Sequence, residues 1–492
     1  MKTLCGIDLG TQSCKVILYD YEKKKIIETA QVPMELIAAN DGTREQKTEW
    51  YREALKLSFG KLSKNAKKTI LALGVSGQQH GFVPLDANGK SLYNVKLWCD
   101  TSTQEECEEL TKAAGGEAAL IKTAGLPMRP GYTAPKVLWL KKHKPKAFAR
   151  LAHILLPHDY INFLLTGTFC AEFGDASGTA LFDVRTRRWS EKVCGYIDPA
   201  VYGCLPALIP PGASAGKVSG EAAAEYGIPE GALVSAGGGD NMMGAIGTGT
   251  VSDGFLTMSL GTSGTLFGFS RKPVIDPTGN LAAFCSSSGG WLPLLCTMNC
   301  TVASEEFRGL FGLTVNELNK EAARAPIGAE GITVLPFFNG ERTPNLPKGK
   351  ASVNGITSAN FKLPNIARAA MESAIFGMRI GLEGFNKLGF KAKEIRLTGG
   401  GSKSSLWQII AANVMNLPVR VPMCSESAAL GAAIQALWVL EGGKRPIGTF
   451  TEEHVALEGG AEIKPDPKFV KTYDTIYEEY SKYLEILSPL YK

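Results

Sequence analysis

A strand, a Leu-Gly-Thr turn and a second strand occur twice in this chain, once at its start and once near its middle. The first copy reads IDLGTQS at residues 7–13, and the second reads MSLGTSG at residues 258–264. Apolar runs flank both turns, which is the pattern of a β-hairpin. We therefore expect two domains of similar fold, each opening with such a hairpin. The Gly- and Thr-rich stretch at 247–254 places the domains at 1–250 and 251–492.

The length and the composition fit this reading. A chain of 492 residues is too long for one ordinary domain. The net charge of +5 gives no argument for a nucleic acid partner. No apolar run suggests a signal peptide or a membrane span, and the eleven scattered cysteines contain no Cys-x-x-Cys pair. We expect a cytoplasmic protein with reduced thiols and no membrane partner.

Strand-like and helical patterns alternate along the chain. Short apolar runs at 70–75, 232–236, 255–260 and 395–398 indicate strands. Apolar residues recur every fourth position in the segment 365–388, which predicts a long amphipathic helix. The fold class that this alternation predicts is α/β.

The two hairpins could hold phosphate groups. Backbone N–H groups in a tight glycine turn can form an anion-binding nest. Asp8 lies beside the first turn, where its carboxylate would repel a bare phosphate but could hold Mg²⁺ directly or through water. A plain β-turn would explain one such sequence equally well. The second copy, with Gly261 and Thr262, favours a clamp on a polyphosphate between two domains.

The segment AGGGDN at residues 236–241 presents a single acid after three glycines. Glycines at a strand end let a ligand approach the backbone closely. Asp240 could accept the proton of an attacking hydroxyl, which is the base that phosphoryl transfer requires. Asp240 could also begin a helix as a capping residue, and the two roles can coexist.

Two further segments contain groups suited to ligands. GQQHG at 77–81 offers Gln79 and His80, whose amide and imidazole groups suit sugar hydroxyls, and Trp98 and Asp100 could line the same site or belong to the core. GGGSKS at 399–404 follows a strand and could lie against a nucleotide, although it matches neither the Walker pattern nor the dinucleotide fingerprint.

Taken in this order, the motifs resemble those of the FGGY family of carbohydrate kinases. The resemblance extends from DLGT at 8–11 to ESAALGAA at 426–433, and it includes PGYTAPK at 130–136 and NGERTP at 339–344. It implies two ribonuclease-H-like, actin-like ATPase domains around a hinged cleft, with ATP and Mg²⁺ as cofactors and a small-molecule sugar as substrate. The N-terminal domain would bind the sugar, and the C-terminal domain would mainly bind the nucleotide.

By motif match, Asp240 would be the base that activates the 5-hydroxyl of a ketopentose, with D-xylulose the leading candidate. The resemblance implies sugar contacts from Gln79, His80, Arg129, Asp240 and Asn241. It implies contacts to phosphate or nucleotide from Thr11, Gly261, Thr262, Gly400, Gly401 and Ser404. The metal would lie near Asp8 and Asp240.

Several alternatives stay open from the sequence. Ribulose, L-xylulose or sedoheptulose could replace D-xylulose, whereas glycerol is disfavoured because glycerol kinases carry an Arg-Glu pair where this chain has Gln79 and His80. A non-catalytic actin-like ATPase would need neither Asp240-Asn241 nor the His80 loop, and a sugar sensor that has lost catalysis would not need to retain Asp8 and Asp240. The sequence leaves the oligomeric state open, with a homodimer among the options.

Overall fold

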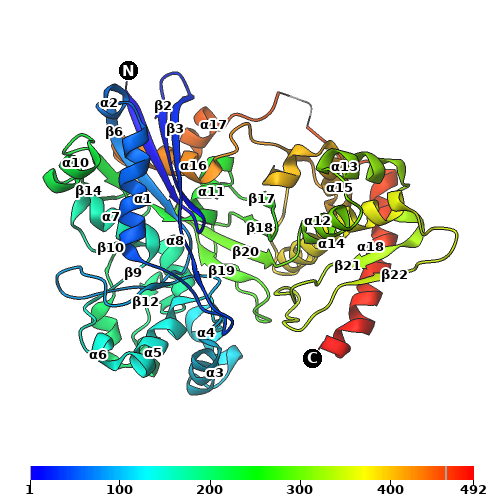
Figure 1. Cartoon of the computed structure of the whole chain (residues 1–492), viewed down its shortest axis with the longest axis horizontal. Coiled ribbons are helices and arrows are strands. Elements are labelled where there is room, and N and C mark those ends of the chain that lie inside the picture. The colour runs from blue at the N-terminus through cyan, green and yellow to red at the C-terminus, as the bar shows by residue number, and fades with distance from the viewer. Residues whose placement is uncertain (1, 460–461, 492) are drawn as a thin grey trace.

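The computed structural model describes residues 2–459 and 462–491, and it has one main β-sheet in each half of the chain (Figure 1). The first sheet has seven strands in the order β14-β15-β6-β1-β2-β3, and β16 also pairs with β6. Its strands are β1 (Thr3–Leu9), β2 (Ser13–Asp20), β3 (Lys25–Pro33), β6 (Ile70–Gly77), β14 (Ser214–Lys217), β15 (Leu233–Ser235) and β16 (Gly238–Gly239). The second sheet has six strands in the order β19-β20-β18-β17-β23-β24. They are β17 (Phe255–Leu260), β18 (Gly264–Gly268), β19 (Ala282–Cys285), β20 (Trp291–Thr297), β23 (Glu394–Thr398) and β24 (Val419–Arg420).

The two sheets share one pattern of strand pairing around their hairpins. β1 pairs antiparallel with β2 across the first Leu-Gly-Thr turn, and it pairs parallel with β6 on its other side. In the same way, β17 pairs antiparallel with β18 and parallel with β23. The repeated motif therefore occupies the same place in two similar α/β sheets, and the predicted fold class is confirmed.

Helices cover both faces of the first sheet. On one face lie α1 (Thr48–Lys61), α7 (Pro157–Thr166) and α10 (Gly220–Tyr226). Their buried side chains, such as Tyr51, Phe59 and Ile161, share a core cluster with residues of β1, β2 and β6. The other face is covered by α11 (Asp240–Thr248) and α16 (Ser427–Leu440), and α16 comes from the second half of the chain.

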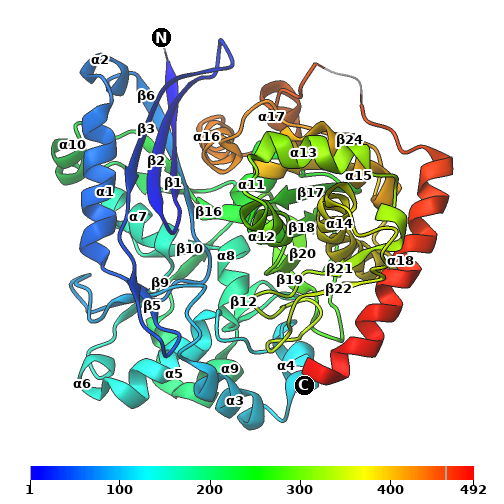
Figure 2. The same ribbon diagram turned by 45° about the vertical axis from the view of Figure 1, so that its right-hand side comes forward.

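Glycines bring α16 unusually close to the first sheet. A Cβ on Gly6 of β1 would lie 1.9 Å from the carbonyl oxygen of Ala429, and one on Gly74 of β6 would lie 2.0 Å from that of Ala432. A Cβ on Gly431 would likewise lie 1.8 Å from the carbonyl oxygen of Met243 in α11. The backbone of α16 therefore rests directly on two strands and a helix of the first half, as Figure 2 shows from the side.

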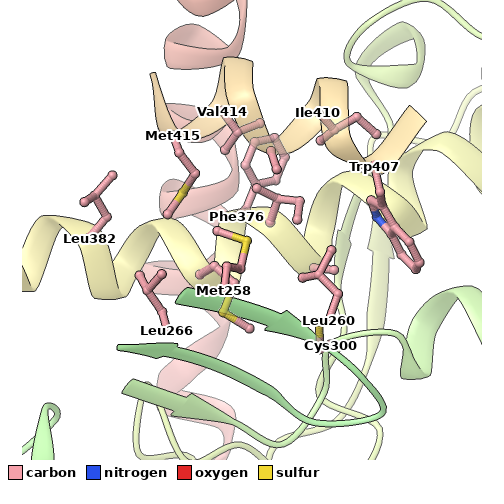
Figure 3. Close-up of a cluster of buried hydrophobic side chains, with 14 of the residues drawn as sticks. Met258, Leu260, Leu266, Cys300, Phe376, Leu382, Trp407, Ile410, Val414 and Met415 are labelled. Atoms are coloured by element: carbon pink, nitrogen blue, oxygen red, sulfur yellow. The ribbon is translucent and has the colours of Figure 1, made fainter. Parts of the chain in front are cut away.

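The second sheet has its own core. The helix predicted at 365–388 is α14 (Leu363–Lys387), which packs on the sheet together with α15 (Ser405–Met415). Figure 3 shows side chains of both helices, including Phe376 and Trp407, above Met258, Leu260 and Leu266 of β17 and β18. The remaining large helices of this half are α12 (Val302–Leu310), α13 (Val315–Arg324), α17 (Ile447–His454) and α18 (Pro467–Leu487).

A smaller helical region extends from the first half, at the lower left of Figure 1. It contains α3 (Gln104–Ala113), α4 (Glu117–Ala124), α5 (Thr133–His143), α6 (Pro145–Phe148) and α9 (Glu191–Ile197). The other elements of the first half are α2 (Lys64–Lys67), α8 (Phe173–Ala176), β4 (Ile37–Ala38), β5 (Arg44–Gln46), β7 (Val83–Leu85), β8 (Val95–Lys96), β9 (His153–Leu155), β10 (Cys170–Glu172), β11 (Phe182–Asp183), β12 (Arg188–Trp189) and β13 (Ala207–Ile209), and a two-stranded sheet of β21 (Thr333–Leu335) and β22 (Ser352–Asn354) belongs to the second. Within the part of the chain that the structure describes, none of the helices combines the length and the apolarity needed to span a bilayer.

Candidate active site

Ser76 on β6 lies between the strand that carries Asp8 and the strand that leads to Asp240, the two acidic residues singled out in the sequence. It lies in register with Asp8 of β1 on one side and with Gly238 of β16 on the other. Since all three strands run parallel, their carboxyl ends meet at one edge of the sheet, where α/β proteins commonly bind ligands. Ser76 Oγ donates a 2.8 Å hydrogen bond to Asp8 Oδ1. Asp240 follows β16 directly, so both carboxylates lie at this edge.

Asp240 is the first residue of α11, and its position depends on the glycines before it. A Cβ on Gly238 would lie 2.4 Å from Ser287 Oγ, and one on Gly239 would lie 2.6 Å from Gln79 Cγ. Only glycine fits at either position without displacing these neighbours. The carboxylate of Asp240 accepts hydrogen bonds from the backbone N–H (2.7 Å) and the side-chain Nδ2 (3.0 Å) of Asn241.

Asn241 extends this contact to Gln79. Its Nδ2 donates a 2.6 Å hydrogen bond to Gln79 Oε1. The other end of the Gln79 amide, Nε2, is buried and has no hydrogen-bond partner among the described residues. A buried donor without a partner costs free energy, and a bound hydroxyl oxygen would satisfy it. Gln79, Asn241 and Asp240, which the sequence singled out as candidate site residues, thus form one hydrogen-bonded group.

His80 lies next to Gln79 in an unusual backbone conformation, with a φ of 61°. Its carbonyl oxygen accepts hydrogen bonds from Lys136 Nζ (2.8 Å) and Thr133 Oγ1 (3.1 Å) at the start of α5. The ring packs against Tyr132 and against Phe284 of β19, with centroid distances of 5.2 Å to each. His80 is therefore held by residues of both halves of the chain.

The carboxylates of Asp8 and Asp240 repel each other at this edge of the sheet. Burial, followed by the negative charge of Asp8, raises the pKa of Asp240 to about 7. Burial also raises the pKa of Asp8, while the hydrogen bond from Ser76 opposes that shift. Two close carboxylates with raised pKa values suit a divalent cation, and Mg²⁺ is commonly bound by one or two carboxylates and several waters. Among the described residues no cluster of three or more metal-binding side chains occurs.

The two hairpin turns offer different groups to a ligand. The hydroxyl of Thr11 is already engaged, because it donates to Gln78 Oε1 (3.0 Å) and accepts from Trp98 Nε1 (3.0 Å). In the second turn, the carbonyl oxygens of Gly261 and Thr262 accept hydrogen bonds from the backbone N–H groups of Thr301 and Cys300, just before α12, while the side chain of Thr262 is exposed. A phosphate contact from Thr11 would therefore come from its backbone, whereas Thr262 has an accessible hydroxyl.

The glycine segment after β23 forms a short 3₁₀ helix, Gly400–Lys403. A Cβ on Gly400 would meet nothing within 4 Å, so this residue faces open space. Gly401 is buried, and a Cβ there would lie 2.7 Å from Leu260 Cβ and 2.8 Å from the ring of Trp407. Ser404 caps α15 and donates a 2.7 Å hydrogen bond to Asn319 Oδ1. Packing thus explains the need for glycine at 401, whereas Gly400 faces open space.

Three other sequence candidates have structural partners elsewhere. The guanidinium of Arg129 pairs with Glu117 and with the carbonyl oxygen of Met128, and none of its described contacts reaches Gln79, His80 or Asp240. Asp100 is fully buried and forms an ion pair with Lys96 at 3.2 Å. The indole N–H of Trp98 is used by Thr11. Asp100 is therefore part of the support of the fold, and the structure does not bring Arg129 into the group.

Comparison with known proteins decides the family. The model for the N-terminal domain of the FGGY family of carbohydrate kinases matches residues 3–247, and the model for the C-terminal domain matches residues 256–440. The chain belongs to the FGGY family of carbohydrate kinases. A xylulose kinase of Haemophilus influenzae is 45% identical over 495 residues and covers 99% of both chains.

Solved structures of other FGGY proteins agree with this fold. A xyloylose kinase from Brucella ovis matches with a TM-score of 0.92 and 30% identity, over 99% of this chain and 100% of the other. A xylulose kinase from Bifidobacterium adolescentis matches with a TM-score of 0.83 and 30% identity, over 98% and 99% of the two chains. The prediction of a two-domain FGGY fold is confirmed.

Sequence reasoning missed several residues that support the FGGY site. Ser76 falls between the strand predicted at 70–75 and the segment at 77–81, and Lys136 ends the segment at 130–136. Their partners, Asp8 and the carbonyl of His80, lie far away along the chain. Asp175 was also missed, because it stands in the run of small residues GDASG at 174–178, which has no chemical signature of its own. The adjacent His158 and Asp159 at the start of an apolar helix were the one local signal of a buried charged group.

Proposed function

We propose that this chain transfers the γ-phosphoryl group of ATP to the 5-hydroxyl of D-xylulose, giving D-xylulose 5-phosphate and ADP. The observation that carries the proposal is the connected group of Gln79, Asn241 and Asp240. In it the buried Nε2 of Gln79 has no partner within the described part of the chain, and the carboxyl of Asp240 has a pKa of about 7. The names of the similar proteins supply the choice of sugar, since they are xylulose kinases.

Asp240 acts as the general base. Its carboxylate takes the proton of the sugar hydroxyl as that oxygen forms a bond to the γ-phosphorus, and the bond from the γ-phosphorus to the bridging oxygen breaks to release ADP. A base with a pKa near 7 is well matched to this step, because about half of it is deprotonated at neutral pH and it still binds a proton well. The hydrogen bonds from Asn241 orient the carboxylate.

The sugar is held by the groups around Asp240. The free Nε2 of Gln79 donates to a sugar oxygen, and the imidazole of His80 and the amide of Asn241 complete the polar contacts. The rings of Tyr132 and Phe284, which flank His80, exclude water from this side. Arg129 has no place in this set, because its guanidinium is paired with Glu117.

The nucleotide lies against the second half of the chain. The turn at Gly261 and Thr262 binds phosphate oxygens, and the open backbone at Gly400 faces the nucleoside. Asp8 and Asp240 would hold Mg²⁺, directly or through water. When bound, this ion neutralises charge on the phosphates and lowers the repulsion between ATP and the two carboxylates.

A coupled ADP-release assay tests the proposal. The enzyme is supplied with ATP and Mg²⁺ and with D-xylulose, L-xylulose, D- or L-ribulose, sedoheptulose, glycerol or gluconate in turn. We expect the highest kcat/KM with D-xylulose. A higher value with another sugar would correct the substrate, and ATP turnover that ignores every sugar would refute the kinase assignment.

A further inference from the structure

A buried aspartate, Asp175, lies between two histidines. One of its oxygens, Oδ1, accepts a 3.3 Å hydrogen bond from the backbone N–H of His80 and lies 3.5 Å from His80 Nδ1. The other oxygen, Oδ2, is 3.1 Å from Nδ1 of His158. Asp175 and His158 are both fully buried, and His80 is 8% exposed. One carboxylate thus contacts both the backbone and the ring side of the histidine that we assign to the sugar site.

The carboxylate of Asp175 is itself held in place. The side chain of Glu172 caps the short helix α8 by accepting hydrogen bonds from the N–H groups of Gly174 (2.6 Å) and Asp175 (2.7 Å). His158 Nε2 lies 2.9 Å from Asp159 Oδ1, so the His158 ring stands between two carboxylates. Burial disfavours its charged form, but these carboxylates outweigh burial and raise the pKa of His158 well above its ordinary value. Asp175 therefore faces a cation on one side and His80 on the other.

The same short segment supports the ring of His80. Gly178 follows Asp175 by three residues, and a Cβ on it would lie 2.0 Å from His80 Cε1 and 2.2 Å from His80 Nδ1. The ring is thus in close contact with the backbone at Gly178, and no larger residue fits there without moving it. The negative oxygen of Asp175 near Nδ1 favours the tautomer that carries its proton on Nδ1, which leaves Nε2 as an acceptor.

We propose that Asp175 is a positioning residue for sugar binding: with Gly178, it holds the left-handed backbone of His80 and its Nδ1–H tautomer, so that Nε2 accepts a hydrogen bond from a sugar hydroxyl. This proposal rests on the proposed function, because it assigns a role to His80 in holding the sugar. Asp175 touches neither substrate nor nucleotide in this scheme and acts only through His80.

Steady-state kinetics separate this role from general support of the fold. We expect Asp175→Asn and Gly178→Ala to raise the KM for D-xylulose about tenfold or more, because each disturbs a hydrogen bond to the sugar, while the KM for ATP changes less than about twofold. Asp86→Asn is the matched control. Asp86 is also buried and accepts backbone hydrogen bonds, from Asn88 and Lys90 at 3.0 Å each, but it lies in a turn after β7 away from His80.

A second measurement reads the tautomer directly and needs no substrate. The chain has five histidines, so ¹⁵N-labelled imidazoles can be assigned by removing them one at a time. We expect the wild-type protein to show His80 protonated on Nδ1 alone, and Asp175→Asn to lose this preference. Unchanged tautomer and unchanged sugar KM in Asp175→Asn would overturn the proposal, as would equal rises in the KM values for sugar and ATP.

The two readouts also separate this proposal from the proposed function. If the wild-type enzyme phosphorylates no ketose, the proposed function fails, whatever the state of His80. If it phosphorylates D-xylulose and both variants keep the wild-type KM for that sugar, only the role of Asp175 fails. Should Asp175→Asn fold poorly, Gly178→Ala tests the same ring position without removing a buried charge.

Discussion

The negative charge of Asp8 contributes to the raised pKa of Asp240, across the strand that carries Ser76. Neither residue could be placed in this way by its own local sequence, because the two are separated by most of the first half of the chain. The parallel pairing of β1 and β16 with β6 brings them to one edge. The residue that we propose as the base and the carboxylate that we propose for Mg²⁺ are thereby positioned by the same strand.

Replacing the base should separate turnover from nucleotide binding. Asp240→Asn keeps the shape of the side chain but cannot take the proton, so we expect kcat to fall by about 10³-fold. ATP affinity, measured by calorimetry without sugar, should change less than about threefold, because we place the nucleotide against the second half of the chain. Turnover of Asp240→Asn within tenfold of the wild type would exclude Asp240 as the base.

The activity should depend on pH through Asp240. Only the carboxylate form can accept the proton, and its pKa in the free protein is about 7. We expect kcat/KM for the sugar to fall about tenfold per unit of pH well below that value and to level off above it. Bound Mg²⁺ lowers the pKa of a nearby carboxyl, so raising the Mg²⁺ concentration should move the midpoint to lower pH. A profile that stays flat from pH 5 to pH 8 would contradict this assignment.

The raised pKa of Asp240 also predicts that its ionised form lowers the stability of the folded protein. The folded state binds a proton on Asp240 more tightly than the unfolded state, whose carboxyl titrates near its ordinary pKa of 3.8. The stabilising effect of this proton is complete below about pH 4 and is lost as the pH rises through about 7. Without Mg²⁺ at pH 8, we expect Asp240→Asn to raise the Tm by about 2 °C or more, with no gain at pH 4. Thermal unfolding by calorimetry would refute the prediction if the variant were less stable than the wild type at pH 8.

The glycine contact between α16 and the first half can be tested with a matched pair of variants. Gly431→Ala places a methyl group 1.8 Å from the carbonyl oxygen of Met243, so the helix has to move. We expect the Tm to fall by about 5 °C or more. Gly60→Ala, in α1, meets nothing within 4 Å and should leave the Tm unchanged or raise it slightly. Equal effects of the two substitutions would show that close packing at α16 does not matter.

Local patterns predicted the parts of the fold that depend on neighbouring residues. The strand Phe255–Leu260, the strand Glu394–Thr398 and the long helix α14 all lie within two residues of their expected bounds, because apolar runs and every-fourth apolar patterns reflect burial directly. The sequence also singled out Gln79, Asn241 and Asp240 one by one, since each stands near a glycine-rich strand end, but the hydrogen bonds that connect them are seen only in the structure.

The sequence could not predict which side chains are already engaged by others, because their partners are often distant along the chain. The hydroxyl of Thr11 is taken by Gln78 and Trp98, and the guanidinium of Arg129 by Glu117. No local pattern records such a choice, because an exposed and an engaged side chain look alike in sequence. The role of Asp175 was missed for the same reason, since its two histidine partners are distant from it along the chain.

The close packing of α16 has a consequence for biosynthesis. The ribosome synthesises β1, β6 and α11 long before α16. At about 5–20 residues per second, the interval between the synthesis of α11 and that of α16 lasts roughly 10–35 s. During that time the apolar face formed by Leu4, Ile17 and Ala72 lacks the part of its cover that α16 provides. The nascent first half is therefore incompletely packed and exposes apolar surface. A truncated chain that stops near residue 250 would expose that surface permanently. Folding of the first half is completed only by one of the last helices of the chain to be made.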